Sequence, residues 1–256
     1  MHISLSAEEL WHFGPLIITN SLLTTWLTIG LLTILAVIFR LRLQSAPQGL
    51  QNILEAMIDG CQQILTEIFA STEKARKLLP LILTTFLFIL CNNWFGLLPG
   101  VGSIGLDPAS NAEHHTSEAD ENHHANFVPI LRAGTADLSL TLTLALIAVI
   151  FVQIIGIRAN GVFAYLGRFL NFANPLKFFT GILELISEFA KIISFSFRLF
   201  GNIFAGEVLL TVIIALVPWF APVPFYGLEI FVGAIQALVF TVLMLVFLKI
   251  AASPAH

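Results

Sequence analysis

Residues 176–217 read LKFFTGILELISEFAKIISFSFRLFGNIFAGEVLLTVIIALV, a stretch of 42 residues that contains no proline. The stretch predicts one continuous helix, because proline is the residue that most strongly interrupts helical hydrogen bonding. At 1.5 Å per residue this helix is about 63 Å long, whereas the hydrocarbon core of a bilayer is about 30 Å thick. The helix is therefore expected to lie strongly tilted, to bend or to divide.

The whole chain has the composition of a membrane protein. Of its 256 residues, 57% are hydrophobic and 11% are charged, against about 45–50% and about 25% in soluble domains. The 12 basic and 16 acidic residues give a net charge of −4, so no basic surface is available for a nucleic acid. Cys61 and Cys91 lack the spacing of a disulfide framework. We expect a single membrane domain over residues 1–256.

Five apolar runs are long enough to span a bilayer. They predict transmembrane helices over residues 16–39, 78–98, 136–157, 176–217 and 225–250. Residues 47–77 instead place apolar side chains at helical spacing among polar ones, which predicts an amphipathic helix on the cytoplasmic surface. A packed helix–turn–helix among cytoplasmic loops is the alternative. The expected fold is an all-α membrane protein with five transmembrane helices and one surface helix, the last two transmembrane helices being long and tilted.

Basic residues gather on one side of these predicted spans, and the positive-inside rule places that side in the cytoplasm. The nine of the 12 that fall there are Arg40, Arg42, Lys74, Arg76, Lys77, Arg158, Arg168, Lys177 and Lys249. Residues 1–15 and 99–135 are then external, and Arg132 is the one basic residue outside. The N-terminus is expected outside and the C-terminus in the cytoplasm.

The external loop contains two histidine pairs, His114–His115 and His123–His124. Histidine is a zinc ligand, but adjacent histidines in an acidic, asparagine-rich loop are more often solvated. We predict no metal site and no cofactor.

Ionisable residues gather in the last two predicted helices, although each one costs about 2.5–3.5 kcal/mol at the centre of a membrane helix. Such residues are functional candidates by default. The long helix contains Glu184, Glu188, Lys191, Arg198 and Glu207, and the last helix contains Glu229 and Gln236.

The spacing of these residues defines faces of the long helix. Glu184, Lys191 and Arg198 follow one another at steps of seven residues, a step that drifts only about 20° around a helix. Asn202 lies one turn beyond Arg198, whereas Glu207 lies about 180° around and ~13.5 Å along the axis. Arg198 stays protonated, so it can attract a carboxylate and block protons but cannot carry one. Alternatively, Arg198 only pairs with Glu184 or Glu207 to stabilise the bundle.

Four sequence motifs resemble those of one family. The stretch SFRLFGNIFAGEVLL, residues 196–210, resembles the signature of the a subunit of F-type ATP synthases. The stretches CNNWFGLLPG (91–100), GTADLSLTLTLAL (134–146) and GAIQALVFTVL (233–243) are similar to other parts of that family. The resemblance covers nearly the whole chain.

The resemblance implies a role for each matching residue. Arg198 matches the family's essential arginine, which faces the carboxylate of each passing c subunit. The other matches are the polar neighbours Asn202 and Gln236, the inner half-channel acid Glu184, and the outer half-channel residues Asn93, Glu207 and Glu229. Two departures are Gly96, where well-known bacterial members carry Asp, and Glu229, where they carry His. Two acids near one path repel when both are ionised, so one of them is expected to hold a proton near neutral pH.

The resemblance also implies a function and partners. The chain is expected to pass ions through two offset half-channels to and from a c-subunit ring, against which its last two helices lie, and so to couple ion flow to rotation and ATP synthesis. It is expected to be no enzyme by itself, to bind b-type peripheral stalk subunits and the rest of the complex, and to lie in the bacterial cytoplasmic (inner) membrane. The alternatives are a stand-alone secondary transporter and a membrane metalloenzyme, although no repeat or HExxH spacing favours either.

Overall fold

A computed structural model describes residues 9–13, 16–43, 49–98, 105–106, 128–129, 131–169, 175–217 and 219–253. Most of these residues are helical. The helices are α1 (Asn20–Arg42), α2 (Leu50–Phe69), α3 (Thr72–Phe95), α4 (Leu138–Asn160), α5 (Val162–Phe169), α6 (Pro175–Leu216) and α7 (Pro222–Ala252), with one 3-10 turn, η2 (Gly134–Ala136). Two short antiparallel pairings join β1 (Glu9–Phe13) to β2 (Leu16–Thr19) and β3 (Gly105–Leu106) to β4 (Val128–Pro129).

Five helices of the described chain, α1, α3, α4, α6 and α7, are long and apolar enough to cross a membrane. This confirms the predicted all-α membrane fold with five transmembrane helices. The histidine pairs of the predicted external loop lie outside the described residues.

Two predicted boundaries differ from the structure for local reasons. The span predicted from residue 16 begins as a strand, and helix α1 starts at Asn20 because the Thr19 side chain accepts a hydrogen bond from the Leu22 amide (3.4 Å). The single helix predicted over 47–77 is divided. Ala70 adopts a left-handed conformation (φ 49°) that ends α2, and the Ser71 side chain caps α3. Helix α2 packs against α3, and its position at the bilayer surface stays a prediction.

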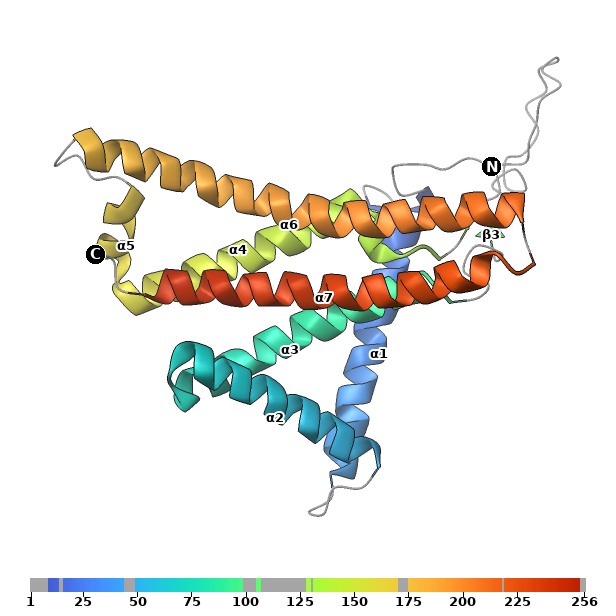
Figure 1. Ribbon diagram of the computed structural model, residues 1–256, viewed down its shortest axis with the longest axis horizontal. Coiled ribbons are helices and arrows are strands. Elements are labelled where there is room, and N and C mark those ends of the chain that lie inside the picture. Colours follow the sequence, from blue (N-terminus) through green and yellow to red (C-terminus); the bar gives the residue numbers. More distant parts are fainter. Residues whose placement is uncertain are drawn as a thin grey trace.

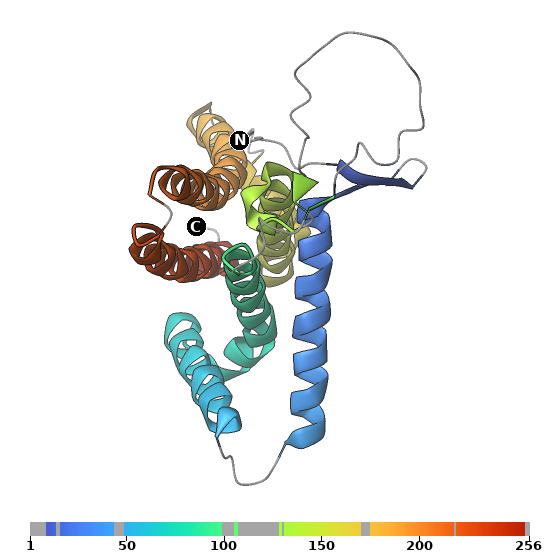
Figure 2. The same cartoon turned by 90° about the vertical axis from the view of Figure 1, so that its right-hand side faces the viewer.

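The long helix α6 runs unbroken for 42 residues. The sequence left open whether this stretch tilts, bends or divides, and the structure shows that it does not divide. Helix α7 lies alongside it, and α1 crosses both helices steeply (Figure 1). Figure 2 shows α1 upright while α6 and α7 are seen almost end-on. The two longest helices therefore run across the direction of α1.

The core lies where α3, α4, α6 and α7 meet. Small side chains such as Ala145, Ala148 and Ala237 are buried at these contacts and let the helices approach closely. Phe195 of α6 fills the space between them, with its ring centroid 4.7 Å from that of Phe240 and 5.6 Å from that of Phe247. The core therefore fixes α6 against α7 while leaving the opposite face of α6 exposed.

Helix α1 buries a polar face. The hydroxyls of Thr24, Thr25 and Thr28 each donate to the backbone carbonyl four residues earlier, at 3.1, 2.8 and 2.9 Å. Each buried hydroxyl is thereby paired within the helix, which removes the cost of burying it. This face packs against α3 and η2, next to the cavity described below.

Candidate functional site

The structure separates the residues singled out in the sequence into groups. Asn93, Glu207 and Glu229 line one cavity of about 190 Å³. Arg198 and Asn202 lie on the exposed face of α6. Glu184 and Gln236 are half-buried, on α6 and α7 respectively, and neither lines that cavity.

The cavity is formed by α3, α6, α7 and the segment that precedes η2. Its lining residues are Asn93, Gly96, Leu97, Leu131, Arg132, Ala133, Ile203, Glu207, Leu210, Thr211, Ile214, Tyr226 and Glu229. Its walls are therefore mainly apolar, with a small set of polar groups among them, a composition typical of binding sites.

Asn93 connects α3 to α7, which also forms the cavity, and to η2. Its amide nitrogen donates to the carbonyl of Gly233 on α7 (2.8 Å), and its oxygen accepts from the Thr135 hydroxyl in η2 (2.7 Å). The approach to α7 is possible because position 233 is glycine, where an added Cβ would lie 3.1 Å from the Asn93 Cβ. Trp94 donates a second bond to this helix, from its indole nitrogen to the Ile230 carbonyl (3.1 Å).

Glu229 is 5% exposed and belongs to α7. Its carboxylate lies directly against Gly206 of α6, where a Cβ would be only 2.1 Å from Oε2. Among the residues that the structure describes, no hydrogen bond or ion pair is formed by this carboxylate. The absence of a side chain at position 206 therefore makes room for an acid on the neighbouring helix.

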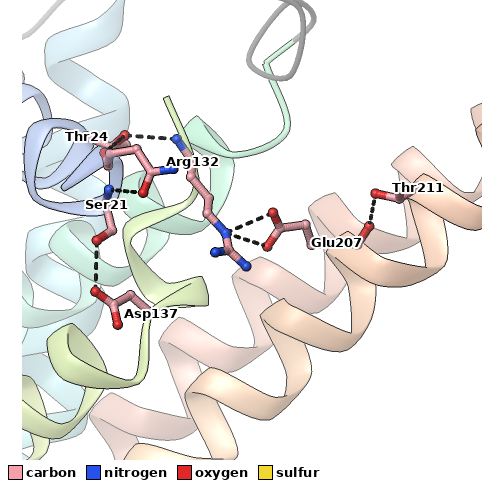
Figure 3. A network of polar contacts seen from close by, with 7 residues as sticks. Ser21, Thr24, Arg132, Asp137, Glu207 and Thr211 are labelled. Atoms are coloured by element: carbon pink, nitrogen blue, oxygen red, sulfur yellow. Dashed lines mark hydrogen bonds and ion pairs between the residues drawn. The ribbon is translucent and has the colours of Figure 1, made fainter. Parts of the chain in front are cut away.

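Glu207 forms an ion pair with Arg132 (Figure 3). Nε of Arg132 lies 3.0 Å from Oε1 and 3.1 Å from Oε2 of the carboxylate, and the Arg132 side chain is 7% exposed. The guanidinium also lies 5.9 Å from the ring centroid of Phe204, within the range of a cation–π contact. Sequence reasoning missed this role, although Arg132 is the one basic residue between positions 99 and 135.

Gly96 has a steric explanation. A Cβ at this position would lie 2.4 Å from the Cβ of Ala133 and 3.1 Å from its Cα. An aspartate, the residue that the resemblance led us to expect here, does not fit beside Ala133 in this arrangement. Gly96 therefore allows the segment that carries Arg132 to pack directly on the end of α3.

Arg198 is exposed, and its nearest polar contact is the Ser194 hydroxyl, 3.3 Å from Nη2. The ion pair with Glu184 or Glu207 that the sequence left open is not formed in the part of the chain that the structure describes. Arg198 is therefore a permanent cation on an exposed helix face, without an acidic partner among the described residues.

A second polar network lies in the other half of α6. Glu188 accepts a hydrogen bond from Gln153 of α4 (2.8 Å) and pairs with Lys191. Tyr165 of α5 donates to Gln153 (2.6 Å), and the Lys191 ammonium lies 4.7 Å from the ring centroid of Phe247. This network fixes α6 to α4 and α5 one turn beyond Glu184.

Asp137 joins the start of α4 to α1. It accepts a hydrogen bond from the Ser21 hydroxyl (2.8 Å; Figure 3). As the N-cap of α4, it also accepts one from the Ser139 amide (2.9 Å). These two hydrogen bonds hold the C-terminal end of the segment that carries Arg132 against α1 and α4.

These features define a multi-pass membrane protein with a carboxylate-containing cavity beside its two longest helices and, on one of them, an arginine that has no acidic partner among the described residues. The profile of the family described as ATP synthase A chain matches residues 22–249. ATP synthase subunit a of Campylobacter jejuni subsp. doylei is 32% identical over 248 residues, which cover 94% of this chain and 95% of the relative.

Two further relatives carry the same name. ATP synthase subunit a of Campylobacter curvus is 33% identical over 245 residues, 94% of this chain and 96% of the relative. That of Campylobacter concisus is 34% identical over 221 residues, 85% and 83% of the two chains. The chain therefore belongs to the family of F-type ATP synthase a subunits, membrane proteins of ATP synthesis and ion transport.

The contact between Glu229 and Gly206 predicts the effect of adding one methyl group. Gly206→Ala should force either the Glu229 carboxylate or helix α7 to move, at a cost of about 1–3 kcal/mol of stability. Chemical unfolding of the detergent-solubilised chain measures this cost. Gly227→Ala is the control, because position 227 of α7 is exposed with open space around it. Equal stability of the two variants would contradict the contact.

Proposed function

We propose that the chain provides two offset half-channels that pass protons to and from the carboxylates of a c-subunit ring. Ion flow through them is thereby coupled to rotation of the ring and to ATP synthesis. The observation that carries the proposal is the exposure of Arg198 on α6, with no acidic partner among the described residues, on the same helix that contributes Glu207 to a cavity lined by two carboxylates.

Electrostatics supports the ring as the partner of Arg198. A guanidinium cannot lose its proton in a protein, and a cation at the centre of a membrane helix is costly unless it is paired or hydrated. The described part of this chain supplies Arg198 with a hydroxyl but no acid. A carboxylate on a neighbouring subunit satisfies the requirement, and a rotating ring presents one such carboxylate after another.

The cavity lined by Asn93, Glu207 and Glu229 is proposed as the outer half-channel. Its volume of about 190 Å³ leaves room for several water molecules. Glu207 lies on the same helix as Arg198 but about 180° around it. The outer path thus approaches α6 from the side opposite to the ring. To reach a ring carboxylate, a proton must pass between α6 and α7 near Asn202 and Gln236.

The inner half-channel is proposed near Glu184, on the other side of Arg198 along α6. Glu184 is half-buried and lies one turn from the Glu188–Lys191–Gln153 network. The two paths are separated by Arg198, which cannot relay a proton. A proton that enters on one side must therefore leave on a ring carboxylate.

The mechanism follows from the cost of charge in lipid. A ring carboxylate that takes up a proton becomes neutral and can face the hydrocarbon region at far lower cost. After almost a full turn it reaches the inner path and releases the proton. Arg198 then stabilises the empty carboxylate and prevents direct leakage. ATP hydrolysis in the rest of the complex would drive the same steps in reverse.

The expected assembly and orientation belong to this proposal. The partners are the c ring, b-type peripheral stalk subunits and the remaining parts of the F-type complex. The location is the bacterial cytoplasmic (inner) membrane, with the N-terminus outside and the C-terminus in the cytoplasm. If α1 crosses the bilayer along its normal, the steep crossing seen in Figure 1 makes α6 and α7 strongly tilted, so that both extend along the ring.

A stand-alone secondary transporter is the alternative. Its substrate site is expected at the midplane between repeats, with broken helices around it. Helix α6 is unbroken and Arg198 faces outward, which favours a subunit that works against a partner. Gentle purification that recovers the chain with a ring of small hairpin proteins supports the first function, and recovery of an active single chain supports the second.

Removal of Arg198 tests the proposal. Arg198→Ala should abolish ATP-driven proton pumping in vesicles that contain the whole complex, while the chain stays in the membrane. Arg198→Lys should fail as well, because an ammonium lacks the planar, permanently protonated fork. Arg42→Ala, which removes an exposed cation from the last turn of α1, is the matched control and should pump normally. Normal pumping by Arg198→Ala contradicts the proposed function.

The role of Glu229 gives a second test. Glu229→Gln should slow transport by about tenfold or more, since general acid–base groups typically contribute about 10²–10⁴-fold to proton transfer. Glu229→His should retain part of the flux, because imidazole is titratable near neutral pH. Proton flux in reconstituted vesicles is the measurement. Unchanged flux in Glu229→Gln would leave the outer path to Glu207 and Asn93.

A further inference from the structure

Arg132 is the charged residue of the cavity lining whose role the proposed function leaves open. It precedes η2 and extends to α6, where its Nε contacts both carboxylate oxygens of Glu207 at 3.0 and 3.1 Å (Figure 3). The residue as a whole is 6% exposed. A buried cation beside an acid is stable only with good geometry, and removal of either partner leaves a costly uncompensated charge.

Two contacts hold the backbone of Arg132 in place. Its amide donates to the Thr24 hydroxyl on α1 (3.4 Å), and the next residue, Ala133, packs against Gly96 at the end of α3. Neither contact depends on α6. The guanidinium is therefore presented to Glu207 by two other transmembrane helices, as expected for a pre-organised counter-charge.

The two acids of the cavity differ in their surroundings. Glu207 has a guanidinium against its carboxylate, whereas no cation contacts Glu229 among the described residues. The other titratable side chain lining the described cavity is Tyr226 of α7, and α3 contributes the neutral Asn93. Because a nearby cation stabilises the charged form of a carboxylate, the two acids are not equivalent.

We propose that Arg132 is a positioning residue of the outer ion path, which keeps Glu207 ionised so that Glu229 is the carboxylate that takes up and releases the transported proton. A proton from external water adds to a Glu229 carboxylate oxygen and forms the neutral acid. Transfer of that proton towards the ring carboxylate then restores the anion. Arg132 and Glu207 keep their charges throughout. The inference rests on the proposed function, because it assigns a role within the proposed outer half-channel.

The rate of ATP synthesis by vesicles containing the whole complex, measured against external pH, tests this assignment. Arg132→Gln removes the cation, so the two acids share a proton more tightly. The midpoint of the pH dependence should therefore move to higher pH by about one unit. Glu207→Gln leaves the cation unopposed beside Glu229, so the midpoint should move in the opposite direction, to lower pH.

Two further variants separate charge from structure. Arg132→Lys keeps a positive charge and should keep the midpoint within about 0.3 units of the unmodified complex, at a reduced rate. The double variant Arg132→Gln/Glu207→Gln removes both charges and should work better than either single variant, since partners in one ion pair are not additive. A purely structural role would lower the amount of assembled complex without moving the midpoint.

The role of Arg132 and the proposed function of the chain can fail separately in these measurements. Midpoints that do not move in Arg132→Gln and Glu207→Gln complexes overturn the role of Arg132, including the case in which only assembly is affected. If Arg132→Gln does not assemble, the shift in Glu207→Gln alone decides. Arg198→Ala is measured in the same vesicles. Its inactivity together with unmoved midpoints rejects only the Arg132 assignment, whereas normal pumping by Arg198→Ala rejects the proposed function.

Discussion

A buried positive charge in a membrane protein is costly unless it is paired or hydrated, and this constraint organises the structure around α6. Two guanidinium groups, one from another segment and one from α6 itself, have different surroundings in the structure. Arg132 reaches α6 from another segment and pairs with Glu207 inside a cavity. Arg198 belongs to α6 itself, points to the exposed face, and contacts only the Ser194 hydroxyl among the polar groups described. The paired arginine belongs to the interior of the chain, and the other one is available to a partner.

The close packing of α7 against its neighbours depends on glycines at the positions where polar side chains lie against the helix backbone. Gly206 makes room for the Glu229 carboxylate, and Gly233 lets Asn93 reach a backbone carbonyl of α7. Phe195 fills the remaining space between the helices. The result is a pair of long helices with a cavity that contains a few polar groups on one side and an exposed face that carries Arg198 on the other. This separation suits a path that must not run straight through the protein.

The regular parts of the fold could be predicted from the sequence, because apolar length and helical periodicity are local signals. The unbroken helix of residues 175–216 and the five spans are examples. A helix–turn–helix was the alternative for residues 47–77, but the position of the break at Ala70 could not be predicted, because left-handed backbone is typical of glycine or asparagine and an alanine gives no signal. The partner of Glu207 also escaped prediction. Arg132 lies in an irregular segment whose path depends on the contact of Ala133 with Gly96, a contact between residues far apart in the sequence.

An electron cryomicroscopy map of the assembled complex tests the central claim most directly. The account predicts that the face of α6 carrying Arg198 lies against the ring, with the guanidinium directed at a ring carboxylate. It also predicts that the cavity of Asn93, Glu207 and Glu229 opens away from the ring, with Arg132 in contact with Glu207. A map in which lipid or a peripheral stalk helix covers the Arg198 face would contradict the account.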